Sequence, residues 1–461
     1  MTAAFPLPVS PPPSTNGSRY FDELRASEYR RLDADDQAYL DFTGSALYSE
    51  RQVTSHARRL RTSVLGNPHS ENGPSLHSTA IINETRTKVL RFLDASPDEY
   101  TVIFVANASA AIKLVAESFP FDSETPLVLS ADNHNSMNGI REFARAGNAS
   151  THYVALDDDL RLAAPVESLK RHRSERGGLF GFPAQSNFSG VKHPLSLIGY
   201  AQRLGYMVLL DAASFLPTTR LSLRVHRPDF VALSIYKMTG YPTGVGILVA
   251  RRESLKKLTR PWFAGGTVEY ASVQHGTHLL IDRGEGFEDG TPAFIDIAAV
   301  GDGLAFLDDI GMDRINEHVM THTDRFITEL SRLRGRNGSA LVEIYGPLSS
   351  RARGGTVAFN VLASDGKTIP FGRVVERARN EGVSLRGGCF CNPGASESAF
   401  HFPSAATRSC LDHARDLGFT IHRFSECLGG AVPVGAVRAS MGIPTNDRDV
   451  DRALAIVRSF A

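Results

Sequence analysis

The sequence predicts an α/β protein whose large domain holds a mixed, mostly parallel sheet and whose second, smaller domain is α+β. The first observation is that strand and helix patterns alternate from about Tyr39 to about Val300, as they do where helices connect parallel strands. The second is that the apolar runs are short and do not alternate, which is typical of strands buried on both faces. The third is a change of pattern after Asp302, where a long helical segment begins.

The expected elements follow from these patterns in chain order. In the large domain the expected strands cover residues 101–105, 126–130, 178–182, 207–210, 230–235 and 246–250. Amphipathic helices are expected between them, over residues 110–118 and 195–204. The second domain is expected to contain a helix over 314–333, a strand over 355–361 and a helix near 371–381.

The predicted domain boundaries divide the chain into three parts. Residues 1–18 are rich in proline and are expected to form a disordered tail. Residues 19–305 would form the large domain, with 19–45 partly packed against the small domain, and residues 306–461 would form the small domain.

Composition excludes several classes of protein. The chain has 50 basic and 50 acidic residues, so no net field favours nucleic acid or an anionic membrane. No segment approaches the roughly 18 consecutive apolar residues of a membrane span. The amino-terminal segment lacks the basic region of a signal peptide. We therefore expect a cytoplasmic protein.

The cysteines favour a reactive thiol over a structural site. Only Cys389, Cys391, Cys410 and Cys427 are present, too few for a disulfide scaffold in 461 residues. Their spacing lacks the paired knuckles of structural zinc sites, so we expect no metal. Reduced thiols are expected in the cytosol.

A lysine and an aspartate at two strand ends indicate a cofactor. Asp211 ends one apolar run and Lys237 follows the next, and open α/β sheets bind ligands at the carboxyl ends of their strands. Pyridoxal phosphate requires a lysine amine and an anion beside its pyridinium nitrogen. The alternative is a solvated loop lysine and an aspartate that caps a helix.

Other strand ends carry groups that suit the same cofactor. Ala108 and Ser109 begin a helix directly after a strand, where free backbone N–H groups bind anions. Ser234 and Tyr236 could add hydroxyl donors. His134 and Asn187 follow two further strands, where an imidazole could lie against a pyridine ring and an amide could reach a phenolate or carboxylate. An ordinary helix cap and a surface histidine are the alternatives.

Longer motifs resemble a known family. The chain resembles the fold-type I, class V aminotransferase group, and within it the amino-terminal sulfurase domain of molybdenum cofactor sulfurases, which are related to cysteine desulfurases. The resemblance runs from about Tyr39 to the end. The motifs that carry it lie at residues 39–48, 67–70, 132–136, 183–191, 211–215, 236–244, 287–291, 388–395 and 435–440.

This resemblance implies a role for each matching cofactor residue. Lys237 would be the Schiff-base lysine, Asp211 would contact the ring nitrogen and His134 would stack on the ring. Ser214 and Asn187 would lie near the phenolic oxygen or the substrate. The phosphate would be held by Ala108, Ser109, Ser234 and Tyr236, and, across the interface of a homodimer, by Thr291 of the neighbouring subunit.

The resemblance also implies a reaction. Cys391 matches the sulfur-accepting cysteine, whose thiolate would take sulfur from L-cysteine as a persulfide and leave alanine. Arg438 matches the arginine that binds the amino-acid carboxylate. Arg386 could assist at Cys391. A protein or small molecule would then accept the sulfur.

Departures from the family keep other functions open. Molybdenum cofactor sulfurases carry a further carboxy-terminal domain, which we do not expect in this chain. Ser396 replaces another cysteine, and Phe42 and Thr43 replace His and Ala. The alternatives are another class V enzyme of specialised metabolism, a C–S or C–C lyase or an aminotransferase, and a non-catalytic protein that binds a partner.

Overall fold

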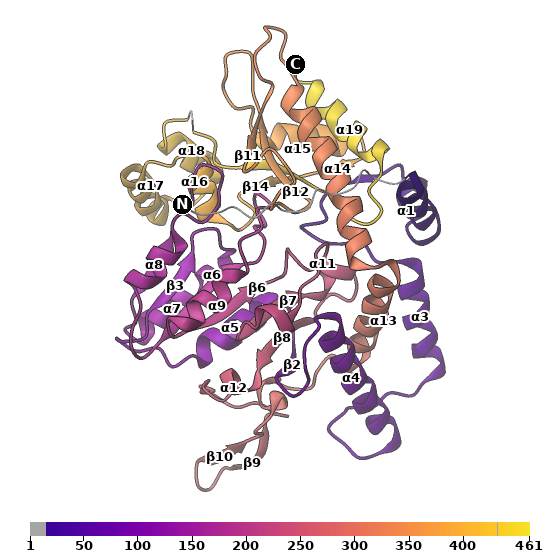
Figure 1. Cartoon of the computed structure of the whole chain (residues 1–461), viewed down its shortest axis with the longest axis vertical. Helices are drawn as coiled ribbons and strands as arrows, with labels where there is room; N and C mark the ends of the chain where they lie inside the picture. Colours follow the sequence, from indigo (N-terminus) through magenta and orange to yellow (C-terminus); the bar gives the residue numbers. More distant parts are fainter. Residues whose placement is uncertain (1–14, 431) are drawn as a thin grey trace, which may run out of the picture.

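The structure is a computed structural model that describes residues 15–430 and 432–461. Figure 1 shows a large α/β region and, above it, a smaller region that contains the C-terminus. Residues 1–14 of the expected tail lie outside the described residues, whereas α1 (Thr15–Glu28) begins inside the range 1–18. Residues 15–18, which the prediction assigned to the tail, are helical.

The large region is built on a seven-stranded sheet with the order β2-β8-β7-β6-β5-β3-β4. β8 is antiparallel to both of its neighbours, β2 and β7, and the other neighbouring pairs are parallel. The strands are β2 (Tyr100–Val105), β3 (Leu127–Ser130), β4 (Thr151–Val154), β5 (Gly178–Pro183), β6 (Tyr206–Asp211), β7 (Phe230–Ser234) and β8 (Gly246–Arg251). The predicted α/β fold class with a mostly parallel sheet is confirmed.

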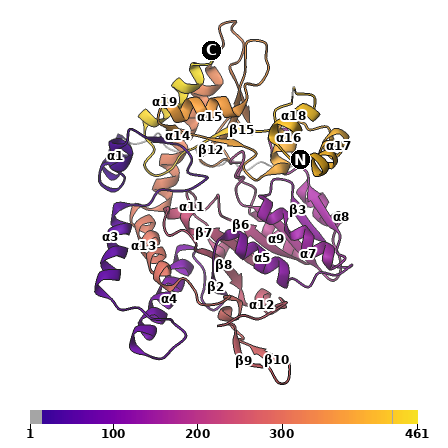
Figure 2. The same ribbon diagram turned by 180° about the vertical axis from the view of Figure 1, so that it is seen from behind.

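Both faces of this sheet are buried, as the unalternating apolar runs predicted. In β6, Val208 and Leu210 belong to one apolar cluster and Leu209 to another on the opposite face. The first cluster includes residues of α4 (Gly73–Phe92), α9 (Ser196–Arg203) and α13 (Phe294–Ile310), and the second includes residues of α5 (Ala108–Ser118) and α7 (Ile140–Ala146). Figure 2 shows α13 beside α4 and α3 (Glu50–Thr62) on one flank.

Short helices and a hairpin complete the large region. The short helices are α6 (Asn135–Asn138), α8 (Pro165–Arg171), α10 (Leu223–His226), α11 (Ile235–Thr239), α12 (Arg252–Leu255) and the 3₁₀ helix η1 (Gly284–Phe287). The antiparallel hairpin of β9 (Val268–Ser272) and β10 (Thr277–Leu280) extends away from the rest of the molecule (Figure 1). The strand predicted over 230–235 ends at Ser234, because Ile235 already begins α11.

The smaller region holds a four-stranded antiparallel sheet with the order β11-β12-β15-β14. Its strands are β11 (Val342–Tyr345), β12 (Thr356–Val361), β14 (Arg386–Gly388) and β15 (Ala436–Ser440). The helices α14 (Met312–Arg332) and α15 (Phe371–Asn380) pack against this sheet, and α19 (Asp447–Arg458) packs against both helices.

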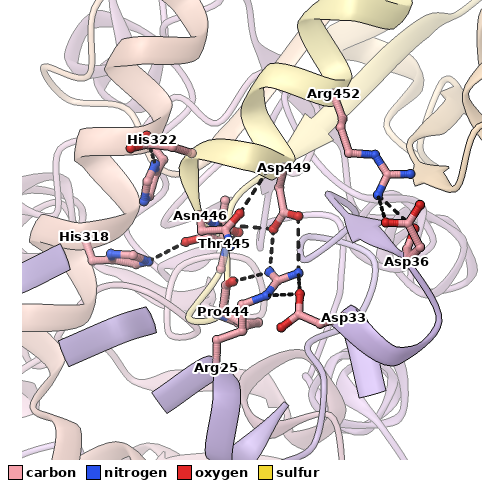
Figure 3. Close-up of polar contacts among 12 residues, drawn as sticks. Arg25, Asp33, Asp36, His318, His322, Pro444, Thr445, Asn446, Asp449 and Arg452 are labelled. Atoms are coloured by element: carbon pink, nitrogen blue, oxygen red, sulfur yellow. Dashed lines mark hydrogen bonds and ion pairs between the residues drawn. The ribbon is translucent and has the colours of Figure 1, made fainter. Parts of the chain in front are cut away.

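The amino-terminal segment joins the smaller region. β1 (Ala38–Tyr39) pairs in parallel with β13 (Val383–Ser384). Before it come α1 and α2 (Arg31–Ala34). On α1, Arg25 is 5% exposed and donates to Asp449 of α19 at 2.7 Å and to Asp33 at 3.0 Å (Figure 3). These contacts fix the path of the chain from α1 to the turn at Asp41.

A helical lobe made of α16 (Pro393–Ala399), α17 (Ser404–Leu417) and α18 (Ile421–Cys427) corrects one expectation. Cys410 and Cys427, expected as reduced thiols, are joined in a disulfide with their Cα atoms 5.8 Å apart. The packing of α17 against α18 brings the two cysteines within disulfide range, and a spacing of 17 residues does not reveal this. Cys389 and Cys391 are free thiols.

Within the two described ranges, no helix has both the length and the apolar character needed to cross a bilayer.

Candidate active site

A cavity of about 240 Å³ lies at the carboxyl ends of β5, β6 and β7. It gathers nine of the residues singled out in the sequence: Ala108, Ser109, His134, Asn187, Asp211, Ser214, Ser234, Tyr236 and Lys237. The parallel strands place these groups together because their carboxyl ends meet at one edge of the sheet.

One end of the cavity suits an anion. Asn107 caps α5 by accepting from the backbone N–H of Ala110 at 2.9 Å, which leaves the first turn at Ala108 and Ser109 facing the cavity. Gly246 allows β8 to pass close by, because a Cβ there would lie 2.3 Å from the carbonyl carbon of Asn107. The buried hydroxyl of Ser234 has no hydrogen-bond partner among the described residues. Donors at a helix amino terminus and an unpaired hydroxyl fit a phosphate.

Lys237 and Asp211 both line the cavity and interact electrostatically. Burial lowers the pKa of Lys237, with Asp211 acting in the opposite direction. Asp211 is 8% exposed, and its Oδ1 accepts from the backbone N–H of Ala213 at 2.9 Å. A lysine with a lowered pKa reaches its neutral, nucleophilic form more easily than a solvated lysine does.

His134 also lines the cavity, at the position that caps the amino end of α6. Its Nδ1 accepts from the backbone N–H of Ser136 at 3.1 Å, which fixes the ring. Burial lowers the pKa of His134, while Asp211 raises it and Lys237 lowers it further. The neutral imidazole is therefore favoured beside Lys237.

Cys391 is exposed in the loop between β14 and α16, and both it and Phe390 have a φ of 56°. The carbonyl of Cys391 accepts from the backbone N–H of Asn135 at 2.7 Å, next to His134. Asn187 donates from Nδ2 to the carbonyl of Phe390 at 2.7 Å. The amide of Asn187, expected to face a phenolate or carboxylate, thus also holds the loop that carries Cys391.

Asn392 anchors this loop below the thiol. Its fully buried amide donates to Asp132 at 2.7 Å and to Oδ1 of Asn187 at 3.0 Å. Asp132 is also fully buried, and it accepts from Ser186 at 2.7 Å and lies 2.8 Å from Nε2 of His193. A buried network of hydrogen bonds therefore joins the loop to Asp132, Ser186 and His193 of the large region.

Arg438 and Arg386 lie outside the cavity lining but within electrostatic range of Lys237, whose pKa both lower. Arg438 is 2% exposed and donates to the carbonyl of Asn187 at 2.8 Å. Both guanidinium groups also bind Asp41. Arg386, expected to assist Cys391, is thus engaged with a carboxylate.

Thr291 is the one predicted cofactor residue that does not line the cavity. Its hydroxyl accepts from Nδ2 of Asn67 at 3.4 Å on the surface of the large region. Its predicted contact with a neighbouring subunit stays a prediction.

Sequence reasoning did not single out Asp41, Asp132 or Asn392. All three stand inside the motifs at residues 39–48, 132–136 and 388–395. The available signal was a carboxyl or amide side chain close to a predicted site residue, as Asp132 is to His134 and Asn392 to Cys391. Among the residues that the structure describes, no cluster of three or more His, Cys, Asp or Glu side chains could hold a metal ion.

Solved structures share this fold. The apo structure of a cysteine desulfurase from Thermococcus onnurineus aligns with a TM-score of 0.77 and 22% identity, over 95% of this chain and 97% of that chain. A C-DES mutant with glycine covalently linked to its PLP cofactor aligns with a TM-score of 0.71 and 15% identity, over 95% of this chain and 99% of that chain.

Sequence comparison finds relatives of higher identity than the solved structures. A molybdenum cofactor sulfurase from Solanum lycopersicum is 34% identical over 480 residues, which cover 96% of this chain and 58% of the relative. The chain thus spans about six-tenths of the length of that relative. The model of the aminotransferase class-V family matches residues 38–453. The fold, the cavity and these similarities lead to one conclusion: the chain is an enzyme that belongs to the aminotransferase class-V family.

Proposed function

We propose that the enzyme is a pyridoxal-phosphate-dependent cysteine desulfurase or sulfurtransferase. It converts L-cysteine to L-alanine and holds the sulfur as a persulfide on Cys391 for transfer to an acceptor. The observation that carries the proposal is that one cavity is lined by Lys237 and Asp211, while the exposed Cys391 lies in a loop hydrogen-bonded beside His134. Relatives named molybdenum cofactor sulfurase and fold neighbours named cysteine desulfurase support the choice of reaction.

The residues of the cavity fit the cofactor that the family implies. The amino end of α5 and the free hydroxyl of Ser234 would hold the phosphate, Asp211 the ring nitrogen and Lys237 the aldehyde carbon. His134 would cover one ring face. When bound, pyridoxal phosphate supplies an electron sink for the bonds around the α-carbon of an amino acid.

The side chains of this chain supply the proton transfers and the nucleophile. Lys237, whose pKa is lowered by burial, takes a proton from the α-carbon and returns one. The thiolate of Cys391 attacks the sulfur of the substrate, so that one C–S bond breaks and one S–S bond forms. The β-carbon gains a proton and leaves as the methyl group of alanine, and the overall transfer needs no external oxidant or reductant.

We also propose that the enzyme is a homodimer. Apolar side chains are exposed on the β9–β10 hairpin and on the segment before it, with Trp262 51%, Tyr270 65%, Val273 99% and Leu279 65% exposed. Isolated exposed apolar residues are common, but a group on one projecting hairpin favours a protein interface. The backbone bond from Gly290 to Gly265 places Thr291 next to this segment, which supports its role toward a partner subunit.

The decisive experiment compares alanine and sulfide release from L-cysteine, with a thiol reductant, in the wild type, Cys391→Ala and Cys389→Ala, all loaded with cofactor. Cys389 is the matched control because it is a free thiol two positions away. We expect both products from the wild type and from Cys389→Ala, and loss of both from Cys391→Ala.

Other outcomes identify other functions. Turnover that survives in Cys391→Ala would contradict the persulfide and favour a C–S or C–C lyase or an aminotransferase. If the cofactor is bound but neither the wild type nor a variant forms either product, the enzyme catalyses a different reaction on the same fold. Failure of the wild type to bind the cofactor would favour a non-catalytic protein.

A further inference from the structure

Asp41 lies between the two arginines near the cavity and binds both. Nε of Arg386 donates to Oδ2 of Asp41 at 2.9 Å and Nη2 of Arg386 donates to the same oxygen at 2.6 Å. Nη2 of Arg438 donates to Oδ1 of Asp41 at 3.0 Å. The side chain of Asp41 is 13% exposed, so it is a largely buried anion that bridges two cations.

The strand register brings the two arginines together. Arg386 on β14 pairs directly with Arg438 on β15, so both side chains emerge on one face of the small sheet. Two like charges directly opposite each other are unfavourable unless an anion lies between them. The bridging anion comes from a different part of the chain, the turn that follows β1.

The backbone around Asp41 fixes its position. Asp41 forms a parallel bridge with Ser440 at the end of β15, and the carbonyl of Asp41 accepts from the N–H of Gly44 at 2.9 Å. Five positions after Asp41, Ala46 donates its N–H to the carbonyl of Tyr236, which lines the cavity next to Lys237. Asp41 is thus held by the small sheet on one side and near the cavity wall on the other.

Arg438 retains capacity for a ligand. Its Nη1 donates to the carbonyl of Asn187, and its guanidinium carbon lies 4.6 Å from the ring centroid of Phe390. Its buried Nε has no hydrogen-bond partner among the described residues. An unpaired donor on a guanidinium this deeply buried is uncommon and points to a group that is absent from the free protein.

We propose that Asp41 is a specificity-determining residue that limits the site at Arg386 and Arg438 to ligands with one carboxylate. Two guanidinium groups and one carboxylate leave a single positive charge. A ligand with one carboxylate balances that charge, whereas the second carboxylate of a dicarboxylate meets no free cation and lies near Asp41. This inference rests on the proposed function, in which this pair receives the carboxylate of an amino acid.

The test measures equilibrium binding of propionate and succinate to the cofactor-loaded enzyme by ligand-observed NMR. Neither probe carries an amine or a thiol, so neither reacts with the cofactor or with Cys391. The measured quantity is the ratio of the succinate and propionate dissociation constants. The variants are Asp41→Asn, which removes the charge, and Asp41→Glu, which keeps it.

We expect Asp41→Asn to shift the ratio toward succinate by about tenfold, because removal of the carboxylate leaves both guanidinium charges uncompensated. Asp41→Glu is expected to keep the wild-type ratio. Asp302→Asn is the matched control, because Asp302 also binds an arginine, Arg59, through both oxygens at 2.8 and 2.9 Å. A ratio that is equal in Asp41→Asn and the wild type would overturn the proposal.

A second variant, Arg386→Gln, tests the proposal if Asp41→Asn does not fold. Arg386→Gln leaves no net charge at the site, so we expect both probes to bind more weakly and succinate to lose more than propionate. Equal losses would also overturn the proposal. The desulfurase proposal and the proposed role of Asp41 can fail separately. If the wild type releases no alanine from cysteine but Asp41→Asn shifts the ratio of dissociation constants, the desulfurase proposal is wrong. If alanine release is normal and the ratio does not shift, the proposed role of Asp41 is wrong.

Discussion

Two lysines with a lowered pKa differ in whether they line the cavity. Burial lowers the pKa of both Lys237 and Lys192, in Lys192 to about 8. Lys237 lines the cavity beside Asp211, whereas Nζ of Lys192 lies 5.8 Å from the ring centroid of Phe215 and does not line it. A lowered pKa alone therefore does not identify the residue that binds a cofactor.

The corresponding prediction compares Lys237→Ala with Lys192→Ala after incubation with pyridoxal phosphate. We expect Lys237→Ala to lose the visible absorbance of a lysine-bound cofactor together with turnover, because Lys237 is the one lysine among the described residues that lines the cavity. Lys192→Ala should retain both. A visible spectrum unchanged in Lys237→Ala would remove this residue from the site.

Arg438 also yields a prediction at the residue scale. Arg438→Ala should weaken capture of the amino acid by about 2 to 5 kcal/mol, the usual cost of removing one partner of a buried charge pair. Burial lowers the pKa of Arg438 to about 10, so the guanidinium is still charged at neutral pH. The measurement is kcat/KM for L-cysteine, with Arg438→Lys as an intermediate case. An unaltered dependence on cysteine concentration would exclude Arg438 as a carboxylate ligand.

At the scale of elements, the loop between β14 and α16 determines where the thiol lies. Asn392 both donates to Asp132 and accepts from the backbone N–H of Ala395, so it caps α16 and ties the loop to the large region. Asn392→Ala should lower the free energy of unfolding by about 1 to 3 kcal/mol, the cost of leaving a buried polar partner unsatisfied. Denaturant unfolding measures this loss.

Loop anchoring also predicts two kinetic changes of opposite sign. In Asn392→Ala we expect faster alkylation of Cys391 and slower release of alanine. A less firmly held thiol is more accessible to the reagent but less well positioned for the reaction. Peptide mass spectrometry measures the rate of alkylation. Ser396→Ala is the control, since Ser396 lies on the same helix and its hydroxyl donates to the carbonyl of Asn392 at 3.2 Å rather than to the large region. Equal alkylation rates in Asn392→Ala and the wild type would contradict the anchoring role.

At the scale of the whole molecule, the contact between α1 and the smaller region depends on a neutral histidine. His318 of α14 stacks on Phe21 of α1 with ring centroids 3.7 Å apart, and its Nε2 lies 2.9 Å from the carbonyl of Thr445 (Figure 3). Burial, together with a smaller effect of the neighbouring His322, lowers the pKa of His318 from 6.5 to about 3. In the unfolded chain His318 is therefore protonated below about pH 6.5, whereas in the folded protein it is protonated only below about pH 3.

Stability should consequently fall as the pH drops below about 6.5, because protons then favour the unfolded chain. Between pH 7.5 and pH 5 we expect His318 to account for a loss of about 1 kcal/mol in the free energy of unfolding, reduced from the full linkage value because the side chain is partly solvated. Urea unfolding at both pH values measures it. His318→Gln should show a smaller loss than the wild type, and an equal loss would contradict this assignment.

The sequence by itself determined the large sheet and most of the cavity. Unalternating apolar runs such as that of β6 identify strands buried on both faces, and the order of the motifs identifies Lys237, Asp211 and His134 as neighbours. This succeeds because parallel strands place successive strand ends at one edge, so that position along the chain predicts position in space.

Only the tertiary structure decided which distant segments meet. Asp41 and Arg438 are 397 positions apart in the chain and Asp132 and Asn392 are 260 apart, and the pairing of Cys410 with Cys427 depends on how α17 packs against α18. The first contact joins the amino-terminal segment to the small sheet, the second joins the smaller region to the large one, and the disulfide forms within one helical lobe. Local patterns report whether a residue is buried, but not which side chain from another element will satisfy its charge.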